Sequence, residues 1–316
     1  MSKIKKYIKN PSLLYMLATA KGLMDWVDDE TQLKRMFKIR VGYPLNLSNP
    51  KTFNEKLQWL KLHDRNPLYN ILVDKYAVKE WVADQIGNEY VTQTYARWGS
   101  ADDIDVSNLP KRFVLKTNHD CGGIAICSNK DSFDLNTAKK KLSSHMKRNY
   151  YWSSREWPYK NVQPCVFAEE YLDPIACTIV DQAGNLDLAD YKVMCFSGEP
   201  KLIQVHKGRF NGTHTQDIYD ANWRRTNIIQ CGLPMSDKPD DCPAILNEML
   251  DLSRVLSKGL AHVRVDWFIS NNGLRFGEMT FYDASGFDAF DNLEHDLLLG
   301  SWIDLSLAFD GKGSGE

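Results

Sequence analysis

The sequence predicts an α+β protein in which a mainly helical N-terminal region precedes two antiparallel sheets. Over residues 1–95, apolar side chains recur at helical spacing, as in Thr52–Leu60. From residue 110 onward, short runs of β-branched and aromatic residues alternate with turn residues, which is typical of strands. The stretch 263–280 indicates a hairpin, because two such runs flank Ser-Asn-Asn-Gly.

A second helix is expected over Asp74–Val82, with Asp74 as its cap and Lys75 in its first turn. A cation in the first turn of a helix opposes the helix dipole unless an anion lies nearby. Lys75 is therefore either a contact for an anionic ligand or an ordinary surface lysine.

The first pair of strands is expected at Arg112–Thr117 and Ile124–Cys127, and the loop Asn118–Gly123 joins them. Paired glycines let backbone N–H groups approach phosphate oxygens, and Lys116 adds a positive charge to the first strand. The loop lacks the Gly-Lys-Ser/Thr of a Walker motif and is followed by a strand rather than a helix. A phosphate-binding loop and a plain turn both remain open.

Further elements follow in order along the chain. Residues 149–164 form an aromatic connection that could serve as a mobile substrate loop, and residues 207–225 read as a long active-site loop or insertion. Ser197–Pro200 is expected as a hairpin turn. The remaining expected elements are helices at Asn136–Arg148 and Ala244–Leu260 and strands at Cys165–Leu172, Ala189–Phe196 and Lys201–His206.

The 263–280 hairpin carries the strongest chemical signal. Pairing of its strands would bring Asp266 and Glu278 together on the face that also holds Arg264. Two inward carboxylates need a neutralising cation, and hard oxygen ligands on a rigid hairpin suit Mg²⁺. Gly277 indicates a close approach to the backbone, and the polar loop Tyr282–Gly286 follows at the strand end. The alternative is a solvated strand face.

The composition is that of an ordinary globular protein. Of the 316 residues, 43% are hydrophobic and 25% charged, and the net charge of −2 gives no reason to expect nucleic-acid binding. Seven cysteines without a Cys-x-x-Cys pair support neither a disulfide framework nor a zinc site, so the cytoplasm is the expected location. The lysine-rich N-terminus permits at most peripheral membrane contact at the inner face.

The order and spacing of these motifs over about residues 45–305 resemble the ATP-grasp family of carboxylate–amine ligases. The chain is most similar to the TupA-like (teichuronopeptide-biosynthesis) branch, which occurs among bacterial capsule and surface-polysaccharide enzymes. The resemblance implies an ATP-grasp fold, in which a lid sheet and a core sheet pinch the nucleotide. It divides the chain into a helical region 1–108 with the first nucleotide lysine, a lid 109–172, a core 173–308 and a disordered tail 309–316.

The resemblance also implies a nucleotide site. Lys75 corresponds to the family's first nucleotide lysine and Lys116 to the second, which lies on the lid strand. The loop Asn118–Gly123 would cover the β- and γ-phosphates, with Asn118, Gly122 and Gly123 as its contacts. In the hinge Glu169–Leu172, backbone groups of Glu170 and Leu172 would read the adenine edge. The usual ribose carboxylate is missing from Ile175–Cys177, so Glu169 or Asp173 would replace it.

A reacting centre follows in the same way. Lys192 resembles a basic residue aimed at the phosphates, and Arg264 the arginine that stabilises charge on the acyl centre. Asp266 and Glu278 match the magnesium carboxylates. Thr280 stands where D-alanine–D-alanine ligases carry an asparagine, and Asp283 is expected to supply the missing oxygen.

The implied reaction is ATP-dependent amide formation through an acyl phosphate, with ATP and Mg²⁺ as cofactors and ADP as product. The expected substrates are a uronic or similar sugar acid and an amino-acid-type amine, either free or linked to a nucleotide or lipid. One rival is a glycosyltransferase or phosphotransferase, although no Asp-x-Asp lies between a strand and a loop. The other is a non-catalytic nucleotide- or sugar-binding protein that stacks ligands on Trp152, Trp157 and Trp223.

Overall fold

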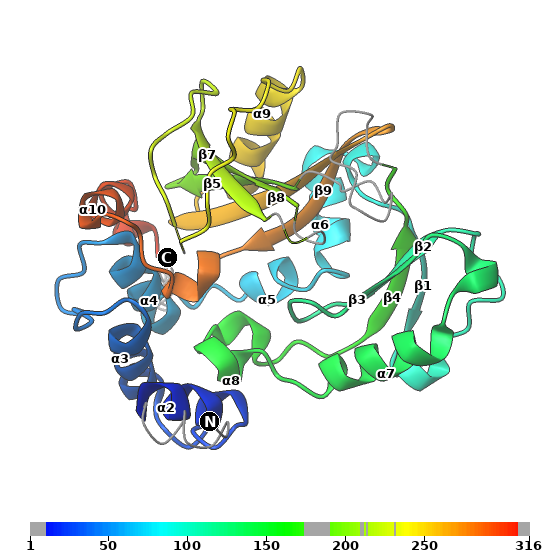
Figure 1. Cartoon of the computed structure of the whole chain (residues 1–316), viewed down its shortest axis with the longest axis horizontal. Coiled ribbons are helices and arrows are strands. Elements are labelled where there is room, and N and C mark those ends of the chain that lie inside the picture. The colour runs from blue at the N-terminus through cyan, green and yellow to red at the C-terminus, as the bar shows by residue number, and fades with distance from the viewer. Residues whose placement is uncertain (1–10, 174–189, 209–211, 213, 231, 309–316) are drawn as a thin grey trace, which may run out of the picture.

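Two antiparallel sheets face each other across the molecule, and helices surround them (Figure 1). The chain is known from a computed structural model, and the two sheets confirm the predicted α+β class with antiparallel strands. The structure describes residues 11–173, 190–208, 212, 214–230 and 232–308. The tripeptide Ile175–Cys177, the lysine-rich segment 1–10 and the tail 309–316, on which some expectations rest, lie outside these residues.

The first sheet has four strands in the order β1-β4-β2-β3. Its inner side chains, such as Phe113 and Leu115, alternate with outer ones and pack against helix α7, whose Leu142 is fully buried. The strand β1 lies within the region that was expected to be mainly helical. The elements are β1 (Thr94–Trp98), β2 (Phe113–Thr117), β3 (Ile124–Cys127), β4 (Val166–Glu170) and α7 (Leu135–Met146).

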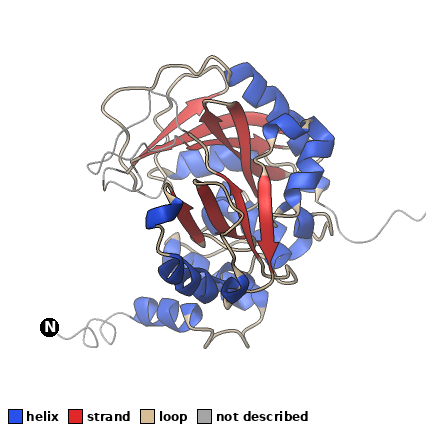
Figure 2. Ribbon diagram, turned by 90° about the vertical axis from the view of Figure 1, so that its right-hand side faces the viewer, coloured by secondary structure: helices blue, strands red, loops and turns tan. Residues whose placement is uncertain are grey.

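The second sheet has five strands in the order β7-β6-β5-β8-β9, and helix α9 packs on one of its faces. Figure 2 shows the sheets with helices around them. Ser197 and Gly198, both with positive φ, form a two-residue turn of the kind that suits a hairpin. The elements are β5 (Asp190–Phe196), β6 (Glu199–Lys207), β7 (Thr215–Asp220), α9 (Leu246–Ser257), β8 (His262–Ser270) and β9 (Gly273–Thr280).

The prediction of a long loop over residues 207–225 is wrong. Within this range β7 pairs with β6 along its whole length, from Leu202 opposite Asp220 to Lys207 opposite Thr215. The sequence of β7, TQDIYD, is mostly polar, yet Gln216, Asp217 and Tyr219 are buried. Their polar atoms find partners on neighbouring elements, as in the hydrogen bond from Ser236 Oγ to Asp217 Oδ2, and hydropathy does not reveal such partners.

The helices of the N-terminal region pack on one another and on α10 through helix α4. Helix α4 begins with a capping box, in which Thr52 and Glu55 satisfy each other's backbone N–H groups. It packs against α10, where Asp296 accepts hydrogen bonds from the backbone and side chain of Asn54. The helices are α2 (Pro11–Ala20), α3 (Asp29–Arg40), α4 (Phe53–His63), α5 (Tyr69–Leu72), α6 (Val78–Ile86) and α10 (Leu293–Ser301).

Helix α6 begins four residues later than the predicted Asp74. The Asp74 carboxylate accepts from the N–H groups of Tyr76 and Ala77, so it caps a turn that precedes the helix and holds Lys75 there. The expected connection 149–164 contains a short helix, α8. Arg155 and Glu156, which follow this helix, are buried. Short helices lie at Asn88–Tyr90, Ala101–Asp103, Lys130–Ser132, Tyr151–Ser154 (α8), Trp157–Tyr159, Asp283–Gly286 and Leu305–Leu307.

The main hydrophobic core lies between the second sheet and its helices. Trp267 is fully buried there, and its Nε1 donates to Ser253 Oγ on α9 at 2.8 Å. Trp157 and Trp223 are partly buried against the same core, where Trp223 stacks on Tyr219. Among the described residues, no helix combines the length and apolar character needed to cross a bilayer.

We expect the contact between α4 and α10 to tolerate no side chain at Gly300. A Cβ there would lie 2.2 Å from Lys51 O, and backbone cannot move aside easily. Replacing glycine by alanine improves helix propensity by about 1 kcal/mol. Overpacking typically costs about 1–3 kcal/mol, and this cost outweighs the gain where the contacted atoms belong to the backbone. Gly300→Ala should therefore lower the free energy of unfolding by about 2 kcal/mol, measured by urea denaturation.

Gly99→Ala is the matched control, because nothing lies within 4 Å of a Cβ at Gly99. Equal stability of the two variants would contradict the assignment of a close backbone contact at Gly300.

Candidate active site

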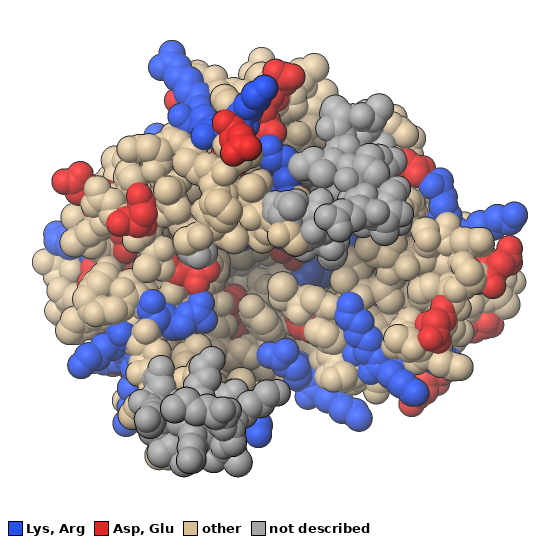
Figure 3. Space-filling view, viewed as in Figure 1, with Lys and Arg blue, Asp and Glu red and all other residues tan. Residues whose placement is uncertain are grey.

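One cavity of about 400 Å³ lies between the second sheet and the loops that face it. In the space-filling view the same region is a hollow with charged atoms at its edges (Figure 3). Its wall is the polar face of the five-stranded sheet, whose other face packs on α9. The sheet residues that line the cavity are Lys192, Gln204, His206, Gln216, Arg264, Glu278 and Thr280.

The register of the hairpin brings the two predicted metal carboxylates together. Asp266 on β8 lies directly opposite Glu278 on β9, as the sequence predicted. A bulge follows, because Trp267 pairs with Phe276 and Gly277 is left over. A Cβ at Gly277 would lie 2.9 Å from the Phe268 ring, so glycine allows that ring to cover the strand. Glu278 lines the cavity, whereas Asp266 is 1% exposed beneath it.

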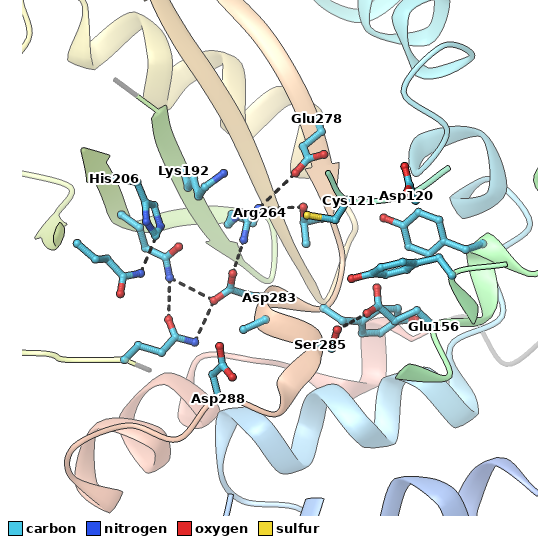
Figure 4. A pocket seen from close by; sticks show the side chains of 18 of the residues that line it. Asp120, Cys121, Glu156, Lys192, His206, Arg264, Glu278, Asp283, Ser285 and Asp288 are labelled. Atoms are coloured by element: carbon cyan, nitrogen blue, oxygen red, sulfur yellow. Dashed lines mark hydrogen bonds and ion pairs between the residues drawn. The ribbon is translucent and has the colours of Figure 1, made fainter. Parts of the chain in front are cut away.

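Arg264 connects the buried carboxylates. Its Nε donates to Asp266 Oδ1 at 2.7 Å and its Nη2 to Asp266 Oδ2 at 2.8 Å, which is a two-pronged contact. Nη1 pairs with Asp283 Oδ1, and Nη2 also reaches Thr280 Oγ1 at 3.1 Å (Figure 4). These four hydrogen bonds use four of the five guanidinium N–H groups. Among the described residues, one Nη1–H is left for a ligand in the cavity.

Lys192 neutralises the same cluster from the other side. It lies opposite Asp266 on the neighbouring strand β5, and its ammonium contacts the Asp266 carboxylate and Asp190 Oδ2, the latter at 2.8 Å. Asp190 was not among the residues predicted from sequence. It lies two residues before Lys192 and therefore on the same sheet face, so the alternation of side chains along the strand could have identified it.

Lys75 crosses the cavity to the hairpin. Its Nζ forms a salt bridge of 2.9 Å with Glu278 Oε2 and donates to the backbone oxygen of Asp120 at 2.8 Å. Burial alone would raise the pKa of Glu278, but Lys75, Lys192 and Arg264 hold it well below its usual range. Lys75 was expected to need a nearby anion, and that anion is Glu278, which lies 203 residues further along the chain.

The glycine loop has a geometry that only small residues allow. Gly122 has φ +89, and a Cβ at Gly123 would lie 1.8 Å from Thr117 Oγ1. The Asp120 carboxylate holds the loop closed, because it accepts from Thr117 Oγ1 and pairs with His145 on α7. Of this loop, Asp120 and Cys121 line the cavity.

Asn118 is engaged entirely with protein. Its Nδ2 donates to Asp74 Oδ2 and to the backbone oxygen of Gln163, and its Oδ1 accepts from the Cys165 N–H. Its backbone oxygen accepts from the Lys75 N–H. Asn118 thus ties the Lys75 turn to the first sheet, and its predicted ligand contact stays a prediction.

Glu169 lies between two lysines rather than beside an open ribose site. Lys116 and Lys79 both form salt bridges with its carboxylate, and Thr92 Oγ1 also donates to it. Burial would raise the pKa of Glu169, yet the two ammonium groups outweigh burial and lower it to about 2. Lys79 was not predicted, although it lies one helical turn after Lys75 in the same segment.

The rest of the predicted hinge continues β4. The backbone N–H of Glu170 donates to Gln93 O, and its carboxylate accepts from Asn272 Nδ2 on the β8–β9 turn at 3.2 Å. Asp173 is half-exposed and pairs with Arg112. Leu172 lies two residues after the end of β4, and roles for these residues toward adenine and ribose stay predictions.

The donor set suits a magnesium ion shared with a ligand. Glu278 lines the cavity beside Asp266, and Mg²⁺ is commonly held by one or two carboxylates together with substrate phosphates. Both oxygens of Asp266 are bound by Arg264 and Lys192, so those bonds would have to open before Asp266 could hold a metal. Within the described ranges, no three His, Cys, Asp or Glu side chains are grouped to hold a metal by themselves. Thr280 Oγ1 accepts from Arg264, and Asp283 is occupied by Arg264, Gln204 and Gln230. Their predicted ligand roles would require these bonds to open.

Comparison with known proteins gives one family. The model described as "TupA-like ATPgrasp" matches residues 55–304. No curated protein sequence matches the chain.

Several solved structures resemble the chain at low identity. The D-alanine–D-alanine ligase of Helicobacter pylori shares 14% identity over 81% of this chain and 70% of its own, with a TM-score of 0.42. The N5-carboxyaminoimidazole synthetase of Staphylococcus aureus, complexed with ADP, shares 17% identity over 81% of this chain and 60% of its own, with a TM-score of 0.44. This chain therefore spans 60–70% of the length of these two structures.

We expect Glu169 to stabilise the fold in a pH-dependent way. Its pKa is lowered on folding from 4.5 to about 2, so its contribution is complete above about pH 4.5 and is lost as the pH falls toward 2. Glu169→Gln leaves Lys79 and Lys116 without their counter-ion and should lower the free energy of unfolding at pH 7 by about 3 kcal/mol.

Urea denaturation at pH 7, 4.5 and 3 measures both effects. The deficit of Glu169→Gln relative to wild type should shrink as the pH falls, whereas the exposed control Glu80→Gln should follow wild type throughout. A deficit that grows toward acid pH would contradict this account.

Proposed function

Because this chain belongs to the TupA-like ATP-grasp family, we propose that it is an ATP-dependent ligase that joins a carboxylate to an amine and forms ADP. The observation that carries the proposal is the cation group on the polar sheet face. Lys75, Lys192 and Arg264 converge on Asp266 and Glu278 at one wall of a cavity. The cations of this group can release the carboxylates and bind the phosphates of a nucleotide, and the released carboxylates can then bind its metal.

The chemistry needs this arrangement. A carboxylate cannot accept an amine directly, because its hydroxide is a poor leaving group, whereas an acyl phosphate releases phosphate readily. Phosphoryl transfer depends on positioning and on cations around the transferred group. Lys75 and Lys192 would provide those charges, and Mg²⁺ held by Asp266 and Glu278 would neutralise phosphate oxygens when bound.

Arg264 would act at the acyl carbon. Its guanidinium is fixed by Asp266 and Asp283, and an N–H held in place in advance stabilises developing oxyanion charge without reorganisation. Two buried glutamines, Gln204 and Gln230, donate to Asp283 Oδ2 and hold that carboxylate in turn. Burial would raise the pKa of Asp283, but Arg264 and these glutamines keep it low, so Asp283 stays ionised.

Lys116 and the hinge 169–172 would hold the rest of the nucleotide against the first sheet. We propose a uronic or similar sugar acid as the acid substrate and an amino acid as the amine, because the chain resembles a family that occurs among surface-polysaccharide enzymes. A glycosyltransferase is disfavoured, because the sequence has no Asp-x-Asp between a strand and a loop.

The reaction class can be tested by its products. With D-glucuronate, D-galacturonate or L-lactate as acid and a set of amino acids as amines, we expect release of ADP and phosphate from ATP that depends on both substrates. The measurement is chromatographic quantification of nucleotides together with mass spectrometry of the amide. Stoichiometric AMP and pyrophosphate would contradict an acyl-phosphate route.

A second test concerns nucleotide binding. Lys116→Ala should weaken Mg-ATP binding at least about tenfold, which is the loss of one charge-assisted contact of roughly 1.4 kcal/mol. The variant should fold, because Lys79 still neutralises Glu169. Calorimetric titration measures the affinity, and the exposed Lys140→Ala on α7 is the control. Unchanged affinity in folded Lys116→Ala would remove Lys116 from the nucleotide site.

A further inference from the structure

The end of the cavity opposite the cation group contains a carboxylate of a different kind. Glu156 is 3% exposed, lines the cavity and lies beside Ser285, away from Lys192 and His206 (Figure 4). Of the carboxylates that line the cavity, Glu278, Asp283 and Asp288 form salt bridges with Lys75, Arg264 and Arg40, and Asp120 pairs with the His145 imidazole. Among the described residues, Glu156 forms none.

Neutral groups hold Glu156 in place. Ser154 Oγ donates to its Oε1 at 2.8 Å and Ser285 Oγ donates to the same oxygen at 2.6 Å. Tyr150 and Tyr159 line the cavity with it. Burial and the charges of Glu156 and Glu278 raise the pKa of Tyr159, so its hydroxyl stays protonated at neutral pH. Burial raises the pKa of Glu156, against the charge of Lys61 and the hydrogen bonds from Ser285 and Ser154. This corner of the cavity therefore offers one carboxyl group, which has an increased affinity for a proton, and neutral hydroxyls.

The buried Lys61 does not neutralise Glu156 by contact. Its ammonium donates to three uncharged oxygens, namely Gln58 Oε1, Ser154 O and Ser285 O, at 2.7–3.0 Å. Burial lowers the pKa of Lys61, although the charge of Glu156 opposes this shift. Its clear structural effect is to tie together the two loops that carry Glu156 and Ser285.

The backbone of this corner is strained in a way that fixes these side chains. Arg155, Ala284 and Ser285 have φ of 59°, 47° and 58°, although none is glycine. Such conformations persist only where the surroundings impose them, and they gather at functional sites. The surroundings here include Lys61 and Gln58 of α4, which bind the carbonyl groups of both loops.

We propose that Glu156 binds the ammonium group of the amine substrate and accepts one of its protons. The inference rests on the proposed ligase function and deepens it. The cavity then has two electrostatic ends: cations at the sheet for the activated acid, and Glu156 for the amine. An anionic ligand would find no direct cation at the Glu156 end, whereas an ammonium would provide the missing partner.

The step balances in atoms and charge. The amine enters as R–NH₃⁺ and gives one proton to the Glu156 carboxylate, which frees the nitrogen lone pair. The nitrogen attacks the acyl carbon of the acyl phosphate, so a C–N bond forms and the C–O bond to phosphate breaks. The second nitrogen proton leaves with the phosphate as HPO₄²⁻, and the neutral amide remains.

The test separates activation of the acid from use of the amine. Hydroxylamine is largely uncharged at neutral pH and captures acyl phosphates as hydroxamates without needing an ammonium site. With Mg-ATP and D-glucuronate, D-galacturonate or L-lactate, Glu156→Gln should form hydroxamate within about twofold of wild type. Its kcat/KM for a cationic amine such as L-alanine should fall at least fiftyfold. The exposed Glu294→Gln on α10 is the control and should match wild type in both assays.

A second variant and a binding assay keep the proposal testable if Glu156→Gln fails to fold. Ser285→Ala removes one hydrogen bond that orients Glu156 and should lower amide formation but not hydroxamate formation. Saturation-transfer NMR compares the wild type's binding of glycine, L-alanine, L-glutamate and L-lysine with that of propionate, which lacks the ammonium group. We expect at least one amino acid to bind in a Glu156-dependent way while propionate is unaffected by substitution.

Each outcome bears on one proposal. Equal losses of hydroxamate and amide in Glu156→Gln or Ser285→Ala, or amino-acid binding that does not depend on Glu156, would overturn the assignment of Glu156. Wild type that binds no amino acid better than propionate would overturn it as well. Wild type that forms neither hydroxamate nor amide would overturn the ligase function, while the binding assay still judges Glu156.

Discussion

The buried carboxylate of Asp266 is the constraint on which the architecture of the site depends. A carboxylate with 1% exposure is stable only if cations replace the water it has lost. Arg264 and Lys192 provide that replacement, from the same strand and from the neighbouring one. Their own burial in turn requires Asp190 and Asp283, so a single buried charge determines a network that covers the polar face of the sheet.

Helix α4 transmits this order to the opposite side of the cavity. Its Gln58 and Lys61 bind the carbonyl oxygens of Ser154, Ser285 and Gly286, which belong to two loops far apart in the sequence. The Asp283–Gly286 turn also holds Arg264 through Asp283. The cation group and the Glu156 corner are therefore connected through the same contacts. A change in either loop should alter side-chain positions at both ends of the cavity.

The sequence was most informative about the local strands and turns. Asp266 and Glu278 lie together as predicted, but only because the bulge at Gly277 shifts the register; continuing the pairing of Trp267 with Phe276 would place Asp266 opposite Gly277. The strand Ile124–Cys127 was predicted with the bounds that it has. The resemblance to the TupA-like ATP-grasp family was confirmed over residues 55–304. Strand β7 was missed because its polar residues find partners on other elements, and neither hydropathy nor turn residues report such partners.

The sequence by itself determined the local pieces: the existence of the hairpin, the helix α4 and the lysines placed next to turns and strands. Only the tertiary structure decided which charges meet, because Lys75 with Glu278 and Lys79 with Glu169 join residues 90 or more positions apart. Local propensity acts over one helical turn or one strand pair, whereas charge compensation acts through space. Glu156 shows the difference most clearly, since nothing near it in the chain distinguishes it from a surface glutamate, and only its burial beside a cavity without a contacting cation does.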